Sequence, residues 1–420
     1  MKEKLFEFSY KIRSWTFTEL VRETVERLFP FALIGSVLTA FRKTVLDDYG
    51  FINNVFDVPS WWKNYEFVDQ YMKSFSHLTL GILGVLAAFF MAELTLKATK
   101  HPDYLAGLTA AIGYLLLFTP QGFTNGKVQL SALSKYTGMS GLLLGILFGY
   151  LIGRLFLRFV VPKYEGNKKN IGISVMGIVL ALALLVNIGI SQLYQSTLAT
   201  DFLTNISDMV STGSLKMTVL GTFLTTTLRW LGLRGVFEVD GEFASVVDTT
   251  NMMYALKHHS VWSVPYPFSE QSLYHSFGVF GGVGGILALA VAIYWVSHSR
   301  HDKSVIRLSL IPTLFGSGQG MLVGLPVLFN PIYVIPFILV PVVNVLLASF
   351  LIMLKVMPPA VYPVPIATPG PLIGFIGSGG NWIELAFGVG IFVLDVLIYM
   401  PFVKLDNRLQ AKLGERADVI

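Results

Sequence analysis

Long apolar runs are the feature that most constrains what this chain of 420 residues can fold into. Five lie in the first half of the sequence, at Leu28–Val45, Leu78–Leu96, Tyr104–Thr119, Gly138–Val160 and Ile171–Leu193. Four lie in the second half, at Met217–Leu233, Ser276–Val296, Tyr333–Leu354 and Ile383–Val403. Because about 20 apolar residues suffice for a helix to cross a bilayer, the runs predict an all-α membrane protein with room for about ten transmembrane helices.

Charged residues are few, and they lie at the ends of the apolar runs. Only 14% of the residues are charged and 53% are hydrophobic, whereas a soluble domain has about 25% charged residues. The formal net charge of +5 does not indicate nucleic-acid binding, because Lys and Arg cluster where the positive-inside rule places them. We therefore expect the lipid bilayer, and no nucleic acid, around this protein.

The basic residues also predict how the chain lies in the membrane. They are frequent before the first apolar run and in the C-terminal segment, for example at Lys11 and Lys412. The loop after the first run is acidic and carries Trp61 and Trp62, which is typical of the opposite face. Both termini are therefore expected in the cytoplasm. Residues 1–27 are expected to be a charged amphipathic N-terminus along the interface, without the cleavage site of a signal peptide.

The character of the sequence changes after about residue 196, which predicts two transmembrane halves. We expect them at residues 28–196 and 216–405, joined by a polar linker at 197–215 and followed by a cytoplasmic tail at 406–420. The second half also holds short apolar pieces broken by Gly and Pro, at Val264–Phe268, Phe315–Phe329 and Met357–Gly380. Such backbone is tolerated at membrane depth only inside protein or around a cavity, and in transporters it points to the binding site. We interpret these pieces as re-entrant segments, with external loops as the alternative.

Most of the side chains that enzyme chemistry needs are missing or carry no motif. The chain has no cysteine, which excludes disulfides, zinc–thiolate sites and a thiol nucleophile. The adjacent His258 and His259 do not have the spacing of metal ligands on a helix, and His275 gives no better signal. The glycines of Gly281–Gly285 are interpreted as close helix packing at the start of a span. No catalytic residue, metal or cofactor is therefore expected within this chain.

Three stretches of the second half are similar to the enzyme IIC permeases of the bacterial phosphotransferase system, of the lactose, cellobiose and diacetylchitobiose type. Ile366–Trp382 reads IATPGPLIGFIGSGGNW, and it resembles the family signature ATPxGPLxGFLATGGDW. Gly324–Phe337 reads GLPVLFNPIYVIPF, and it resembles FGLPIVLNPxxxIPF. Phe280–Gly285 followed by Leu308–Pro312 resembles GGSGAT and LSLIP. The matching order extends from about residue 15 to about residue 405.

This resemblance implies an elevator-type permease with ten transmembrane helices and two re-entrant hairpins. The first five spans would form the scaffold of a homodimer. The last five would bind a sugar, such as a disaccharide, and carry it across the membrane by a rigid-body movement. A separate cytoplasmic IIB protein, working with a IIA protein, would phosphorylate the arriving sugar.

Two positions depart from the family pattern in a way that matters for this chemistry. Gly232–Gly235 reads GLRG where the family has GIHG, so that Arg234 replaces His. Phe315–Gly320 reads FGSGQG where the family has FNINEP, so that Gln319 replaces Glu. A His–Glu pair can take the proton of a sugar hydroxyl as the phosphoryl group arrives, whereas Gln cannot and Arg keeps its own proton. We therefore expect sugar binding to survive, while coupled phosphorylation is left open.

Six residues are expected to contact the sugar, namely Arg234, Gln319, Trp382, Trp230, Glu238 and Asn381. The two tryptophans can stack on the apolar face of a sugar ring, with an interfacial aromatic belt as the alternative. Glu238 is a carboxylate close to Arg234 in sequence, and a helical ion pair between the two is the alternative. Asn381 stands where the family usually has Asp.

Three functions fit this pattern. The first is a IIC subunit of a sugar phosphotransferase system. The second is a facilitator that releases unphosphorylated sugar, and the third is a membrane sensor that keeps the sugar-binding fold. The replacements at Arg234 and Gln319 motivate the second and the third.

Overall fold

The computed structural model describes residues 2–118, 123–124, 127–128, 136–161, 168–194, 212–237, 245–325 and 327–417. Within these residues the regular elements are helices, apart from a hairpin of two-residue strands. The elements of the first half are α1 (Lys2–Arg13), α2 (Thr16–Phe41), η1 (Arg42–Leu46), α3 (Phe51–Phe56), α4 (Val58–Trp61), α5 (Tyr65–Thr79), η2 (Leu80–Ile82), α6 (Leu83–Lys97), α7 (Tyr104–Phe118), β1 (Phe123–Thr124), β2 (Lys127–Val128), α9 (Leu142–Phe159) and α10 (Lys168–Tyr194).

The elements of the second half are α12 (Leu215–Trp230), α13 (Val246–His258), η5 (Gln271–Gly278), η6 (Val283–Gly285), α14 (Ile286–Val296), α15 (Arg300–Leu314), α16 (Gln319–Gly324), α17 (Val334–Met353), α18 (Gly370–Gly377) and α19 (Trp382–Ala417). The all-α fold class expected from the apolar runs is thus confirmed. The expected linker at 197–215 lies almost entirely outside the described residues.

Seven helical stretches of the described chain are long and apolar enough to cross a membrane. They are Thr16–Leu46, Tyr65–Lys97, Leu142–Phe159, Asn170–Gly189, Gln271–Val296, Val334–Met353 and Trp382–Leu413. Two further expected spans correspond to the shorter helices α7 and α12, of 15 and 16 residues. The protein therefore passes the membrane several times, and the number of about ten spans stays a prediction.

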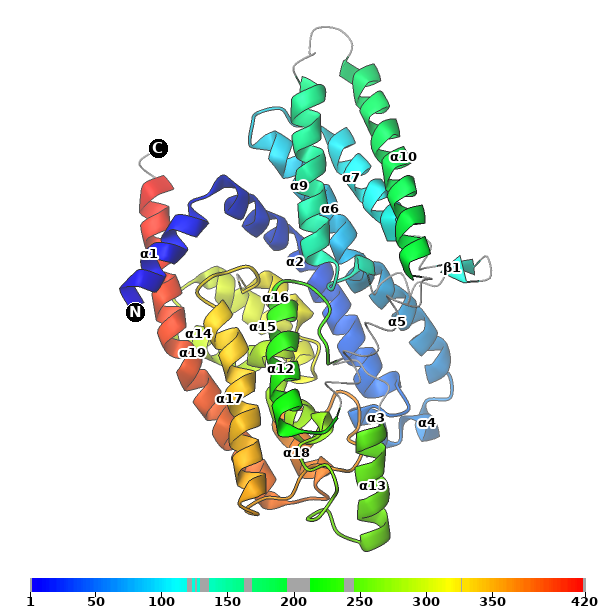
Figure 1. Ribbon diagram of the computed structural model, residues 1–420, viewed down its shortest axis with the longest axis vertical. Coiled ribbons are helices and arrows are strands. Elements are labelled where there is room, and N and C mark those ends of the chain that lie inside the picture. Colours follow the sequence, from blue (N-terminus) through cyan, green and yellow to red (C-terminus); the bar gives the residue numbers. More distant parts are fainter. Residues whose placement is uncertain are drawn as a thin grey trace.

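The four helices α6, α7, α9 and α10 form a bundle that occupies the upper part of Figure 1. Small residues let α6 and α9 approach closely, since a Cβ atom on Gly149 would lie 2.3 Å from the carbonyl oxygen of Ala88. Such close approach is the usual means by which helices associate in a membrane. The outer helix α10 leaves Ile178, Leu182 and Leu185 exposed, so this side of the bundle presents an apolar surface.

Helix α2 connects this bundle to the second half. It runs without a break from Thr16 to Phe41 and contains Pro30, so the amphipathic segment expected near the N-terminus is continuous with the first span. Leu20, Val21 and Val25 on this segment are buried. They belong to the main hydrophobic core, where α2 packs against α6, α15 and α16.

The two ends of the described chain lie side by side, with α1 along the last turns of α19 (Figure 1). Arg13 Nη1 donates to Asp406 Oδ1 at 2.6 Å, and both side chains are almost fully buried. Asp406 also accepts hydrogen bonds from Asn330 and Gln410. Helix α19 therefore continues past residue 405, after which the cytoplasmic tail was expected to begin. The ion pair between Arg13 and Asp406 holds the start of this expected tail against α1.

The expected span at Ser276–Val296 is not one regular helix, and this is a correction. A π-helix, η5, ends at Gly278, and the regular helix α14 begins only at Ile286. Between them Gly281, Gly282, Gly284 and Gly285 all have positive φ angles, which only glycine adopts at little cost. The glycines thus break the helix here, instead of serving only to pack a continuous helix against its neighbours.

The irregular segments at 315–333 and 357–381 contain only short helices. Helix α16 has six residues and α18 has eight, which corresponds to about 9 and 12 Å at 1.5 Å per residue. Neither can cross a hydrocarbon core of about 30 Å. Their re-entrant character stays a prediction, but both segments do reach a common pocket.

Candidate functional site

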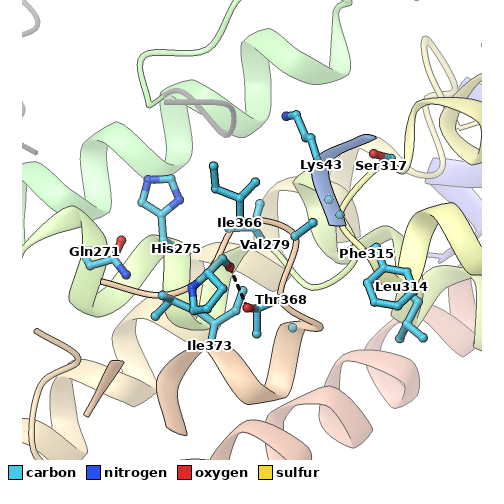
Figure 2. A pocket seen from close by; sticks show the side chains of 17 residues that line it. Lys43, Gln271, His275, Val279, Leu314, Phe315, Ser317, Ile366, Thr368 and Ile373 are labelled. Atoms are coloured by element: carbon cyan, nitrogen blue, oxygen red, sulfur yellow. Dashed lines mark hydrogen bonds between the residues drawn. The ribbon is translucent and has the colours of Figure 1, made fainter. Parts of the chain in front are cut away.

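A pocket of about 110 Å³ lies where four segments of the fold meet. These are η5 and the glycine turn after it, the turn between α15 and α16, the loop before α18, and η1 from the first half (Figure 2). Two of the three pieces interpreted as re-entrant segments, Phe315–Phe329 and Met357–Gly380, therefore contribute to the lining, whereas Val264–Phe268 does not. The lining residues with polar side chains are Lys43, Gln271, His275, Ser317 and Thr368.

The loop before α18 forms one wall of the pocket, from Val364 to Thr368 and at Gly370. Thr368 Oγ1 donates to the carbonyl oxygen of Pro365 at 2.7 Å, which closes a tight turn (Figure 2). From Ile366 onward this wall belongs to the signature stretch. The sequence thus carried a signal for this part of the site, although Thr368 itself was not singled out.

The first half contributes to the pocket through η1 and the residues that follow it. Lys43 lies on η1 and is one of the lining residues (Figure 2). Nearby, the backbone N–H of Phe51 donates to the carbonyl oxygen of Ile366 at 2.9 Å, and the N–H of Ile366 donates to Tyr49 at 2.7 Å. Gly50 and Ile366 form a parallel bridge between these bonds. The pocket wall is therefore hydrogen-bonded to the first half of the chain.

The π-helix η5 places a histidine and a glutamate together beside the pocket. Glu270 immediately precedes η5, and His275 lies on it five residues later. In a π-helix, hydrogen bonds join residues five apart, so these two side chains lie on the same side. His275 Nε2 and Glu270 Oε1 are 2.8 Å apart, and both side chains are mostly buried, with exposed fractions of 14% and 19%.

Gln319 lies at the start of α16, two residues after the pocket-lining Ser317. Its Oε1 atom is buried and has no hydrogen-bond partner among the described residues. The next residue, Gly320, donates its backbone N–H to Ser36 Oγ of α2 at 2.7 Å. Gln319 itself does not line the pocket, but the turn that carries it does.

Arg234 and Trp230 lie at and beyond the end of α12, away from the pocket lining. Arg234 is exposed. Trp230 donates its Nε1–H to the carbonyl oxygen of Val327 at 3.1 Å, and its ring lies 6.4 Å from that of Phe329. Trp230 therefore anchors the turn after α16. Glu238 lies outside the described residues, as do Asp240 and Glu242.

Asn381 and Trp382 lie at the start of α19. Asn381 Oδ1 accepts from the backbone N–H groups of Ile383 at 2.9 Å and Glu384 at 3.4 Å, which is the pattern of a helix N-cap. Trp382 is 73% exposed and contacts the ring of Phe375. Neither side chain lines the pocket.

The six residues expected to contact the sugar stay predictions. None of the six expected residues lines the pocket, whereas Lys43, Gln271, His275 and Ser317 do. Lys43 carried no signal, because it lies outside every motif. His275 and Glu270 are five apart, which puts them on different faces of an ordinary α-helix with 3.6 residues per turn.

Together, the spans and the pocket between broken helices define a helical membrane transport protein. The family model of the phosphotransferase system, EIIC, matches residues 24–341, and the chain belongs to this family. It is thus the IIC component of a sugar phosphotransferase system, the membrane subunit through which sugar is translocated. The resemblance seen in the sequence motifs is confirmed.

Three similar proteins are lactose-specific EIICB components of phosphotransferase systems. The lactose-specific EIICB component of Staphylococcus epidermidis is 25% identical over 99% of this chain and 72% of its own length. That of Staphylococcus haemolyticus is 24% identical over 96% of this chain and 69% of its own length. That of Staphylococcus aureus is 34% identical over 30% of this chain and 22% of its own length.

A solved structure is also similar. It is that of the transporter ChbC, the IIC component of the N,N'-diacetylchitobiose-specific phosphotransferase system. The two chains align over 96% of each, with a TM-score of 0.43 and 20% sequence identity.

Proposed function

We propose that this protein imports a disaccharide and that a IIB protein or domain phosphorylates the sugar on the cytoplasmic side. The observation that carries the proposal is the pocket shared by the two glycine- and proline-rich segments of the second half. Its apolar lining, with a few polar side chains such as Gln271 and Thr368, has the character of a small-molecule site. The lactose-specific names of the relatives support a disaccharide as the substrate.

The division of the pocket between the two halves supports an elevator movement. All lining residues except Lys43 belong to the second half. In this proposal residues 28–196 form a fixed scaffold and residues 216–405 carry the sugar. The backbone bonds of Ile366 with Tyr49 and Phe51 hold the moving half in the present position, and they break when it moves.

The proposed partners follow from the same division. The exposed apolar residues of α10 support a homodimer that forms through the scaffold half. The family supports a IIB partner, and a IIA protein completes the proposed phosphate relay. Both termini are proposed to lie in the cytoplasm, because basic residues flank the first and last spans.

Gln319 is the one expected sugar contact for which the structure gives support. Its buried Oε1 atom, with no partner among the described residues, costs free energy unless a ligand or water satisfies it. It follows the turn that lines the pocket, so a rearranged turn brings this amide to a bound sugar. Arg234, Trp230, Trp382, Asn381 and Glu238 stay predictions.

One observation favours a second function, a facilitator that releases free sugar. Neither Arg234 nor Gln319 can accept a hydroxyl proton. If no other group of the site takes this role, transport proceeds without phosphorylation.

The proposal is tested by sugar flux through purified protein in liposomes. We expect saturable exchange of radiolabelled lactose, cellobiose or N,N'-diacetylchitobiose, and no exchange of sucrose beyond that of empty liposomes. The absence of saturable binding and flux for every sugar of the panel would contradict it.

A further inference from the structure

A fully buried carboxyl group lies behind the broken helix of the second half. Asp395 belongs to α19, in a stretch that is long and apolar enough to cross the membrane, and its exposed fraction is 0%. Gly285, at the end of the glycine break, faces this side chain, since a Cβ atom there would lie 3.9 Å from Asp395 Oδ2. Ionisable groups inside a membrane span are rare, and they are functional candidates by default.

Asn344 of α17 links this carboxyl group to the helix that lines the pocket. Its Nδ2 atom donates to Asp395 Oδ2 and to the carbonyl oxygen of Phe277, both at 3.0 Å. Phe277 lies on η5, between the pocket-lining residues His275 and Val279. A single amide therefore joins Asp395 to the backbone of the segment beside the pocket.

Among the described residues, the elements around Asp395 supply no counterion. The residue makes no ion pair there. Of the helices in contact with α19, α14, α17 and α18 contain no Lys, Arg or His, and their one titratable side chain, Tyr294, is exposed. The titratable residues of η5 are Tyr274 and His275, and His275 faces Glu270.

The other titratable groups along α19 do not balance the charge either. Tyr399, one turn further on, donates its hydroxyl to a backbone carbonyl. Glu384 is a second acid, and Asp406, where α1 contacts α19, lies about three turns away. A buried carboxylate without a counterion costs so much free energy that the group takes up a proton instead. Asp395 is therefore a proton-binding group in this position.

Two oxygen atoms of the pair show where this proton fits. Asp395 Oδ1 and Asn344 Oδ1 are buried, and neither has a hydrogen-bond partner among the described residues. The N–H groups of the amide are used by Asp395 Oδ2 and Phe277, so its oxygen can only accept. A proton on Asp395 Oδ1 removes the charge and makes this atom a donor, for which the neighbouring amide oxygen is an acceptor.

A metal cation fits this place less well than a proton. Ions such as Mg²⁺ and Ca²⁺ take six or more oxygen ligands, whereas two oxygen atoms lack a partner here. The described residues also contain no group of three or more His, Cys, Asp or Glu that could hold a metal ion. The geometry thus favours a proton.

We propose that Asp395 is a proton site of the half that carries the sugar and that one proton crosses the membrane with each sugar. The inference rests on the proposed function, because it requires residues 216–405 to move. In the present position the proton is bonded to Oδ1. As the sugar is released on the cytoplasmic side, this O–H bond breaks, the proton passes to water and the carboxylate keeps the electron pair. The site takes up another proton from the outer side before the next sugar.

The test uses purified protein in liposomes, in potassium buffer without sodium, with valinomycin to hold the membrane potential at zero. The lumen is made about one pH unit more alkaline than the outside. For wild-type protein we expect radiolabelled lactose, cellobiose or N,N'-diacetylchitobiose to accumulate inside about tenfold, because one proton per sugar transfers the full tenfold proton ratio to the sugar. A pH-sensitive dye in the lumen should record proton entry when the sugar is added.

Asp395→Asn separates the proton from the fold. The amide has the shape of the neutral carboxyl group and offers one acceptor and one donor to Asn344, but it has no acidic proton to release. We expect this variant to keep the wild-type midpoint of thermal unfolding and the wild-type rate of sugar exchange, while accumulation and the dye signal are lost. Glu384→Gln removes the other fully buried carboxyl group of α19. It is the matched control and should still accumulate sugar about tenfold.

The outcomes separate the inference from the proposed function. If wild-type protein exchanges sugar but a pH gradient drives no accumulation, the inference is wrong and the proposed function stands. If it neither exchanges nor accumulates any probe, both are wrong. Accumulation driven only by a sodium gradient, or accumulation that survives in Asp395→Asn, would overturn the inference. So would a lower unfolding midpoint together with lost exchange in Asp395→Asn, because the amide would then not replace a neutral carboxyl group.

Discussion

Trp230 shows how one side chain fixes the turn after α16. Its Nε1–H donates to the carbonyl oxygen of Val327 across 97 positions of sequence. We expect Trp230→Phe, which keeps an aromatic ring, to lower the free energy of unfolding by about 1–2 kcal/mol because this carbonyl loses its partner. Denaturant unfolding of purified protein measures it, and an unchanged free energy would show that the bond does not contribute.

Single residues were the least predictable part of the site. Trp230 was expected to stack on sugar, and Asn381 to replace a family carboxylate. The structure gives Trp230 a hydrogen bond to the backbone and makes Asn381 the N-cap of α19. A sequence motif indicates that a side chain has a role, but it does not distinguish a contact with the ligand from a hydrogen bond that fixes the backbone of a loop or a helix end.

The broken helix between η5 and α14 is the element on which the pocket depends most. Gly284 has a φ angle of 77°, and a Cβ atom there would lie 2.4 Å from the ring of Phe337. Its carbonyl oxygen accepts a hydrogen bond from the hydroxyl of Tyr399. This glycine therefore fixes the break against both α17 and α19.

We expect Gly284→Ala to destabilise the protein. The left-handed backbone costs about 1–2 kcal/mol for an alanine, and the contact with Phe337 adds about 1–3 kcal/mol of overpacking. The midpoint of thermal unfolding in detergent measures the effect. Gly177→Ala in α10 is the matched control, because among the described residues no atom beyond its own stretch of helix lies within 4 Å of its added Cβ. Equal midpoints for the two variants would contradict the account.

At the scale of elements, the sequence predicted where helices occur better than how they are interrupted. Apolar length and the placement of Gly and Pro identified most spans and both short-helix segments. The π-helix was not predictable, because its i to i+5 pairing of Glu270 with His275 depends on the tertiary packing of η5 against α17 and α18 and not on a periodic pattern.

The whole molecule is held in one arrangement by contacts between its halves, such as the bridge between Gly50 and Ile366. Gly50 and Ile366 are more than 300 residues apart in the sequence, and no local sequence pattern predicts that they pair. Only the structure shows this bridge. If the second half moves as an elevator, the bridge must open in every transport cycle.

The natural absence of cysteine makes this movement testable. We expect the double variant Phe51→Cys with Ile366→Cys to be joined by a short bifunctional thiol reagent, and sugar uptake to stop until a reductant releases the link. Each single variant, treated in the same way, is the control, and the reagent should leave its own uptake rate unchanged. Uptake at the wild-type rate by fully crosslinked protein would contradict the elevator proposal.

The measurement that tests the account most directly is the chemical form of radiolabelled disaccharide taken up by wild-type vesicles, with and without internal phosphoenolpyruvate and cytoplasmic extract. The account predicts that sugar phosphate accumulates inside, and only when the phosphoryl source is present. Uptake of free sugar at the same rate under both conditions would contradict it and would show a facilitator that works without phosphorylation.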